Sequence, residues 1–353
     1  MIRPDRIKSE IFGGVGWRQP INDGAPVIDE DNLSATGNLY YQDGNSFVTI
    51  QNINDCQQYD TITDEQLNDY LTQLQESAIL EVCQKISENE TDFIQSVNLF
   101  PYEKSFKNTI EPSGKFVGFQ IIPIKMVDML SQINWIELAF DSVKTFNIHL
   151  YNSNLPGVPI KTQPVTTVAN SSVIVSLTDW FIADGETFKG GTFYLGYFED
   201  DLDGAKAIKR DYELSEVQVT TRCNYITPAI LTHSGAIIDI TTVSEKSQTY
   251  GLNFGMDIYN DYSELFIRNK SQLYQVIQYQ MAEKVFGIIR SSVRSNITQR
   301  INKDNGVLDA YAFELYGNRE AGIIGITGKL KRAVENLKKT FFYKPLIQRK
   351  TLR

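Results

Sequence analysis

The chain has 353 residues, of which 42% are hydrophobic and 22% charged, and a formal net charge of −9. This length is typical of two or three domains, and the apolar content suffices for packed cores, which excludes a disordered chain. No apolar run approaches the ~18–20 residues of a membrane span, and Met1 is not followed by the apolar segment of a secretory signal peptide.

The three cysteines, Cys56, Cys83 and Cys223, are odd in number and widely spaced. This pattern argues against a disulfide framework and against a zinc site built from Cys. We therefore expect a soluble protein that folds in a reducing cytosol and has no membrane partner.

The charge is unevenly distributed along the chain. Residues 1–100 contain five Lys or Arg against 17 Asp or Glu, whereas residues 329–353 contain nine basic residues and one acid, Glu335. A basic terminus of this kind can be a solvated tail, or can meet nucleic acid, an anionic membrane surface or an acidic protein face. The acidic first hundred residues of a neighbouring copy would provide such a face.

In chain order, residues 1–61 are interrupted by glycines at short intervals, which predicts extended chain and turns. Residues 47–50 follow an Asp-Gly turn signal and predict a strand, with residues 39–41 as the hairpin partner. A segment of this kind buries little by itself. We expect an arm laid over another domain or another subunit.

A helix is predicted from Thr63 to about residue 87. Thr63 and Gln66 fit a capping box, and the two acids that follow Thr63 suit the helix dipole. Apolar residues recur at a spacing of three to four, which predicts one amphipathic helix. Four acids lie outside the apolar stripe and predict a solvated or docking face: Asp69, Glu76, Glu81 and Glu88.

Between residues 113 and 211 the apolar period changes from 3.6 to 2. Five runs rich in β-branched and aromatic residues predict strands, and turn clusters separate them. The runs are residues 115–122, 135–140, 145–151, 173–177 and 192–198. About 100 residues of closely spaced strands predict a β-sandwich of jelly-roll type.

Three further strands are predicted at residues 216–222, 236–242 and 250–258, after which the pattern becomes helical. Residues 262–300 contain no proline and could form a helix of ~55 Å at about 1.5 Å per residue, unless Gly287 or the serines at 291 and 292 break it. A final helix at residues 327–340 carries much of the basic charge.

The expected fold class is therefore mixed α and β. It consists of a jelly-roll-like β-sandwich flanked by an extended N-terminal arm plus helix and by a C-terminal domain with a long helix. The expected domains are residues 1–112, residues 113–215, and residues 216–353 with the basic tail. Because neither flank contains enough apolar surface for a comfortable core, we expect the sandwich to interrupt a single domain.

Motifs of catalysis are scarce. The only histidines, His149 and His233, have no metal-ligand spacing, and the glycine-rich stretches at residues 13–16 and 317–328 lack a phosphate-loop signature. We expect no enzyme activity, no catalytic residue and no cofactor. One acidic loop is a weak candidate for a bound cation, through Asp200, Asp201 and Asp203.

Several segments resemble virion proteins of tailed phages that infect Bacteroidetes. They are residues 11–20 (IFGGVGWRQP), 37–42 (GNLYYQ), 48–53 (VTIQNI) and 190–197 (GGTFYLGY). The chain is similar to the head–tail structural proteins of crAss-like phages, the ring or adaptor subunits below the portal. This resemblance implies a homo-oligomeric ring around the DNA channel, contact with the portal or other tail ring proteins, and no enzyme activity.

The function expected from these observations is that of a structural virion protein, made in the bacterial host cytoplasm and located in the tail. The acidic helix and the basic C-terminus would dock between copies or onto adjacent rings, or the basic tail could touch packaged DNA. The expected interface residues are Lys329, Lys331, Arg332, Lys338, Lys339, Lys344, Arg349, Lys350 and Arg353, together with Asp69, Glu76, Glu81 and Glu88.

Two alternatives come from other function classes. A carbohydrate-binding adhesin or receptor-binding protein would use aromatic residues of the sandwich to stack on sugars, namely Trp135, Trp180, Phe181, Tyr194 and Tyr197. A hydrolase would need a pair of carboxylates whose separation the sequence does not indicate.

Overall fold

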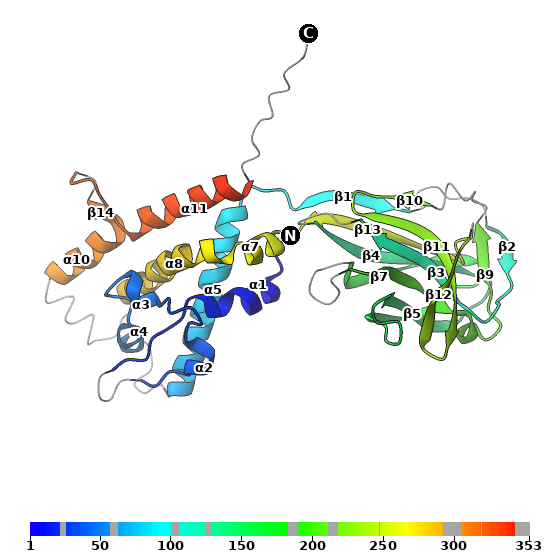
Figure 1. Ribbon diagram of the computed structural model, residues 1–353, viewed down its shortest axis with the longest axis horizontal. Coiled ribbons are helices and arrows are strands. Elements are labelled where there is room, and N and C mark those ends of the chain that lie inside the picture. Colours follow the sequence, from blue (N-terminus) through cyan, green and yellow to red (C-terminus); the bar gives the residue numbers. More distant parts are fainter. Residues whose placement is uncertain are drawn as a thin grey trace, which may run out of the picture. The chain divides into compact units, whose positions relative to one another are not determined.

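The computed structural model describes residues 1–21, 26–56, 63–99, 106–124, 129–182, 190–210, 218–246, 248–291, 305–318 and 320–342 (Figure 1). It divides into two compact units. One unit, the β domain, comprises Thr91–Asp261 together with Met1, and the other, the helical domain, comprises Ile2–Glu90 and Tyr262–Arg353. The two ends of the chain thus build one domain, and the β domain interrupts it in sequence.

This interruption was expected from the sequence, but the expected boundaries at residues 113 and 215 are wrong. Strands before residue 113 and after residue 215 pair within the same two sheets, so the β domain is longer at both ends. Strands near residues 216–222, 236–242 and 250–258 were predicted but assigned to the C-terminal domain, because periodicity indicates a strand and not the sheet that it joins. The short strands β1 and β2 had no predicted counterpart.

The β domain consists of two antiparallel sheets. The first has the order β1-β13-β4-β9-β2 with β7 beside β4, and the second has the order β10-β11-β3-β8-β5-β6 with β12 beside β11. The strands are β1 (Phe93–Asn98), β2 (Phe106–Ile110), β3 (Phe116–Pro123), β4 (Met129–Phe140), β5 (Thr145–Asn152), β6 (Lys161–Thr166), β7 (Ser171–Ile182), β8 (Phe193–Phe198), β9 (Ala207–Arg210), β10 (Val219–Thr220), β11 (Asn224–Ser234), β12 (Ile237–Glu245) and β13 (Leu252–Asn260).

The inner faces of these sheets form one apolar core. The ring of Phe119 on β3 lies 5.3 Å from that of Phe254 on β13, so side chains of the two sheets meet there. The buried hydroxyl of Tyr197 donates to the carbonyl of Tyr250 at 2.9 Å, which provides a partner for its polar end. The predicted sandwich and its five main strands are confirmed. Burial alternates along the first residues of β5, as one buried face requires, whereas every residue of β8 is buried.

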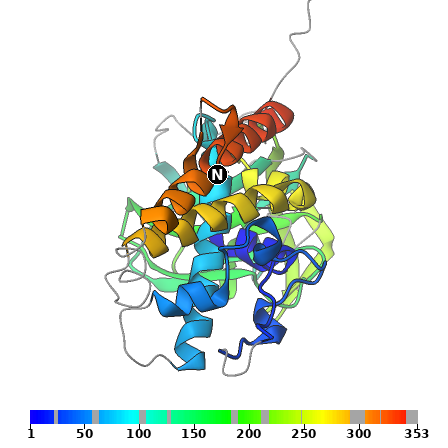
Figure 2. The same ribbon diagram turned by 90° about the vertical axis from the view of Figure 1, so that its left-hand side faces the viewer.

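The helical domain contains α1 (Pro4–Ile11), η1 (Phe12–Gly14), α2 (Glu30–Leu33), α3 (Tyr41–Gly44), α4 (Ile50–Asp55), α5 (Asp64–Ser87), α7 (Tyr262–Arg268), α8 (Lys270–Ser291), α10 (Asn305–Tyr316), α11 (Ile326–Phe342) and the short hairpin of β14 (Gly317–Asn318) and β15 (Ile323–Ile324). Figure 2 shows α5 running across the domain beneath α8 and α11. Side chains from both ends of the chain enter one core.

The long helix predicted near Thr63 is confirmed as α5, including its capping box. The Thr63 hydroxyl accepts from the backbone N–H of Gln66 at 3.2 Å, and the Gln66 side-chain oxygen accepts from the backbone N–H of Thr63 at 3.2 Å. Two otherwise unpaired backbone donors are satisfied in this way. The final predicted helix is likewise observed, as α11.

The predicted hairpin in the N-terminal segment is wrong. Tyr41–Gly44 is the helical turn α3, and Ile50 begins helix α4, whose first turn is capped by the Thr49 hydroxyl accepting from Asn52 N–H at 3.1 Å. Val48 is fully buried in the helical core rather than paired in a ladder. Tertiary packing has overridden a local β pattern. The segment is part of its own domain's core and not a free arm.

The predicted helix at residues 262–300 is interrupted earlier than expected. It ends at Arg268 and restarts at Lys270, because the Asn269 side chain donates to the carbonyl of Leu265 at 2.8 Å and the Gln272 N–H bonds the carbonyl of Asn269 at 2.9 Å. The second piece, α8, spans 22 residues, or about 33 Å, and Gly287 lies within it. Residues 292–300 lie outside the described part.

The glycine-rich stretch near the N-terminus serves close packing. A Cβ at Gly16 would lie 2.3 Å from the backbone nitrogen of Ala35 and 2.5 Å from the carbonyl oxygen of Leu33. Gly16 also donates to the carbonyl of Leu39 and accepts from the N–H of Tyr41, each at 3.0 Å. Only a residue without a side chain permits this approach of two backbones.

Among the described residues, no helix combines the length and apolar character that crossing a bilayer requires.

We expect Gly16→Ala to lower the free energy of unfolding by about 1–3 kcal/mol, because backbone atoms must move to admit the methyl group. Gly13→Ala is the matched control, since a Cβ there meets only the Thr36 side chain at an ordinary 3.5 Å. Its effect should stay within about 0.5 kcal/mol. Urea denaturation followed by circular dichroism measures both, and equal losses would contradict the close-packing explanation.

We also expect the helical domain to fold without the β domain. The ends of the β domain adjoin, because Asn260 N–H donates to the carbonyl of Asp92 at 2.7 Å and β1 pairs with β13. Replacing residues 92–260 by a short Gly-Ser linker should leave a helical spectrum and cooperative thermal unfolding, with the isolated residues 91–261 as the complementary control. Loss of cooperativity in the shortened chain would show that the two domains depend on each other.

Candidate assembly surfaces

Three of the four acids expected to form a docking face on α5 are paired inside the helical domain. Glu76 accepts an ion pair from Lys8 of α1 at 2.7 Å, Glu81 pairs with Lys284 of α8, and Glu88 lies 3.5 Å from Lys338 of α11. Each of these three acids thus has a partner within its own domain, and their role in docking stays a prediction. The pairs form because α5 is surrounded by helices from both ends of the chain, which sequence periodicity does not reveal.

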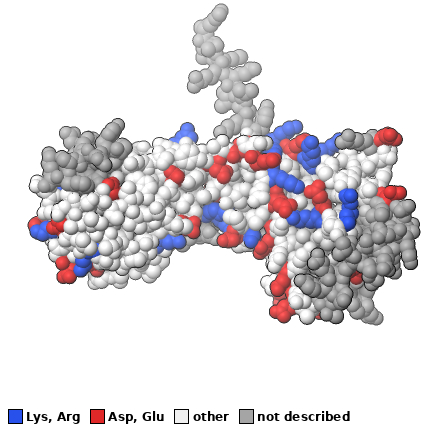
Figure 3. Space-filling model, turned by 180° about the vertical axis from the view of Figure 1, so that it is seen from behind, with Lys and Arg blue, Asp and Glu red and all other residues white. Residues whose placement is uncertain are grey.

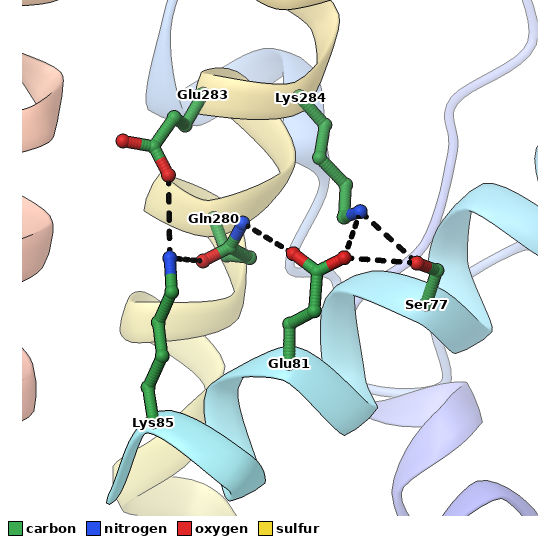
Figure 4. Close-up of polar contacts among 6 residues, drawn as sticks. All are labelled: Ser77, Glu81, Lys85, Gln280, Glu283 and Lys284. Carbon is green, nitrogen blue, oxygen red and sulfur yellow. Dashed lines mark hydrogen bonds and ion pairs between the residues drawn. The ribbon is translucent and has the colours of Figure 1, made fainter.

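A polar network joins α5 to α8 (Figure 4). Gln280, only 2% exposed, donates to Glu81 at 2.9 Å and accepts from Lys85 at 2.7 Å. Lys284 donates to Glu81 and to the Ser77 hydroxyl, the latter at 3.0 Å. The polar end of each of these side chains thus has a partner, as a polar group removed from water requires. This cluster holds two helices together and leaves no group directed at a ligand.

Most basic residues of α11 differ from these acids of α5, because no described residue pairs with them. Leu330, Val334 and Leu337 are buried on one face of the helix, as a spacing of three to four residues predicts. Four cations are exposed on the remainder of its surface, and no described residue pairs with them: Lys329, Lys331, Arg332 and Lys339. We call these four residues the cationic face. The other expected basic residues, Lys344, Arg349, Lys350 and Arg353, lie outside the described residues.

Acids gather at another place in the helical domain, around α2 and the first turns of α5. Six of them are exposed, and no described Lys or Arg pairs with them: Asp29, Glu30, Asp31, Asp64, Glu65 and Asp69. We call them the acidic end. Hydrogen bonds hold the two segments side by side, since the N–H of Asp29 donates to the Asn68 side chain at 3.0 Å and that of Val27 to Asp64 at 3.4 Å.

Within the helical domain the two surfaces lie apart. In Figure 3, Asp and Glu gather at the lower end of this domain, over α2 and the start of α5, whereas Lys and Arg lie near its upper edge, over α11, with further Asp and Glu beside them. Of the acidic end, the sequence analysis had named only Asp69. The run Asp29-Glu30-Asp31 was a signal that could have indicated the rest, but it lay in a segment interpreted as an extended arm.

The acidic loop proposed as a weak cation site does not assemble one. Asp203 pairs with Lys144 at 3.0 Å, and Asp200 faces His233 at 3.5 Å. The buried Glu199 accepts from the N–H groups of Ser113 and Lys115, which anchors the loop to the sheet. Among the described residues, no group of three or more His, Cys, Asp or Glu could hold a metal ion.

The aromatic residues considered for sugar stacking are largely unavailable. Trp180, Tyr194 and Tyr197 are buried in the β domain. Trp135 is half-buried over Gly255, where an added Cβ would lie 2.2 Å from the indole nitrogen. Phe181 is half-buried as well. Because stacking needs an exposed ring face, the structure offers little support for the adhesin alternative.

The three cysteines are packed into cores, and the two histidines are half-buried. Cys56, Cys83 and Cys223 are buried and form no disulfide. Burial raises the pKa of the Cys83 thiol to about 12, so this thiol is protonated at neutral pH. Burial also lowers the pKa of His149, against a weaker opposing effect of Asp201.

Comparison with protein-family models gives no match, and comparisons with curated proteins and with solved structures give none either.

We expect Glu81→Ala to destabilise the protein by about 1–3 kcal/mol, because Gln280 and Lys284 lose their shared acceptor. A double-mutant cycle with Lys284→Met should give a coupling energy clearly different from zero. Glu320→Ala is the control, since this side chain is exposed at a turn and its change should stay within about 0.5 kcal/mol. Additive effects in denaturant titrations would argue against a coupled network.

Proposed function

We propose that this chain is a structural virion protein, a subunit of an oligomeric ring or adaptor in the head–tail connector or tail of a phage. The observation that carries the proposal is the separation of unpaired charge in the helical domain. The cationic face and the acidic end have opposite signs, lie on different parts of one domain, and contain no described ion pair that would neutralise them. The resemblance of segments such as residues 11–20 to phage virion proteins supports the same function.

Such a charge distribution suits assembly from identical copies. When a surface on one copy fits a different surface on the next, the contact is head-to-tail, and repeated contacts close into a ring if the rotation permits. Complementary charge accelerates encounter and selects the partner.

The structure changes one part of the mechanism expected from sequence. An exchanged N-terminal arm is no longer needed, because Ile7, Ile11 and Trp17 are buried in the core of their own domain. Assembly would instead use the outer surfaces of a folded domain. The β domain has its own core and would be a separate module of the subunit, and the portal or other ring proteins would be the neighbours of the ring.

The proposal predicts discrete high-order assemblies that weaken as salt is added, because screening reduces the attraction between exposed charges. Analytical ultracentrifugation at low and high salt, followed by electron microscopy, measures this for the chain alone and with candidate virion neighbours. Mass spectrometry of purified particles tests location in the virion. Absence from particles, together with a monomeric state under every condition, would overturn the proposal.

The helix α11 is not a suitable place for truncation in this experiment. Its residues Leu330, Val334 and Leu337 belong to the core, so its removal would unfold the domain regardless of any assembly role. Removing only residues 343–353 keeps these core residues and tests the four more distal basic residues by themselves.

A further inference from the structure

A groove lies on the helical domain between α1, α2 and α5. Its volume is about 440 Å³, and its lining includes Phe12, Asp29, Asn32, Leu33, Asn68 and Asp69. Lys8 and Glu76 also line it, and they neutralise each other as an ion pair at 2.7 Å. The charge that remains is negative, because no described Lys or Arg pairs with Asp29 or Asp69. Its size suits a few side chains rather than a whole helix.

The chemistry of this groove fits a basic side chain. Lys and Arg bury their apolar stems along apolar surface and keep the charged group in a polar environment. Here the ring of the half-buried Phe12 provides apolar surface, while the carboxylates of Asp29 and Asp69 are exposed beside it. An anionic ligand would be repelled by the same carboxylates.

Basic side chains that pair with no described residue are found on α11. Lys329 lies in the first turn of this helix, which contains no acid, and the positive end of the helix dipole disfavours a cation there. Its position is therefore not explained by helix stability. Arg332 and Lys339 are seven residues apart and project along one stripe opposite the buried Leu330 and Val334.

The cationic face does not reach the groove of its own chain. α11 meets the C-terminal end of α5 at Glu88, whereas the groove lies near Thr72, about 24 Å away along the helix. Figures 1 and 2 both place α8 between α11 and α1. This separation is far longer than a lysine side chain, so the contact requires a second copy.

We propose that the cationic face of α11 docks its Arg332 and Lys339 side chains into the groove of a second copy of this chain, between Asp29 and Asp69. This inference rests on the proposed ring function and names the surfaces that such a ring would use. DNA is the other anionic occupant that α11 could meet, and the experiment below distinguishes it from the groove.

Charge reversal tests the contact. R332E/K339E and D29K/D69K should each weaken self-association at low salt by about 10- to 100-fold, because like charges then meet at the interface. A chain that carries all four substitutions should recover assembly, and so should a mixture of the two variants, since opposite charges meet again in both. K161E/K246E on the β domain is the control, with the same change in net charge as R332E/K339E.

Sedimentation velocity measures association, and circular dichroism verifies that each variant is folded. Recovery in the four-substitution chain would support the contact even if each pair alone lowered stability. If R332E/K339E and D29K/D69K both assemble at the wild-type level, the inference is overturned, and the ring proposal still stands. A wild-type chain that stays monomeric in low salt would also overturn it, and experiments with virion neighbours would then decide the function separately. Loss of duplex DNA binding in R332E/K339E, with normal assembly, would assign α11 to DNA instead.

Discussion

The contact between α5 and α8 is the interaction on which the helical domain depends. α5 comes from the N-terminal part of the chain and α8 from the C-terminal part, with the whole β domain between them in sequence. Their apolar faces enter one core, to which Leu71 and Val82 contribute from α5 and Val276 and Met281 from α8. The N-terminal helices are too short to be stable alone, and they gain stability only by packing on this pair.

The polar network along the same contact has a further consequence. Glu81 serves Gln280 and Lys284 at once, and Lys85 reaches Gln280 from the neighbouring turn. A shift by one helical turn would separate these partners and leave a nearly buried amide unsatisfied. The network therefore favours a single register of α5 on α8, and with it the position of every element packed around them.

Pairing of charges within the domain determines which charges remain for other contacts. Once Glu76, Glu81 and Glu88 are neutralised by lysines of α1, α8 and α11, the unpaired charges that remain include the cationic face and the acidic end. Under the proposed function, the separation of the cationic face from the acidic end makes the contact between copies specific. A copy that approaches in the wrong orientation presents like charges to its neighbour.

The sequence by itself determined the secondary elements whose signal is local. The alternation along β5 and the amphipathic pattern of α11 follow from the two periods of the backbone. The capping box at Thr63 is a local side-chain motif, and the charge segregation can be counted directly. The sequence also indicated that a sandwich interrupts another domain. It misjudged residues 39–50, where local β preference was overridden, and it placed the break in the C-terminal helix too late.

Only the tertiary structure decided which charges are available. The acids of α5 look alike in sequence, yet Glu76, Glu81 and Glu88 face lysines that lie far away along the chain, whereas Asp69 lines an open groove. Asp29 joins the same groove from a segment that sequence analysis had interpreted as an arm. Whether a charged group is neutralised depends on neighbours brought together by long-range packing, and periodicity along a single helix contains no information about them.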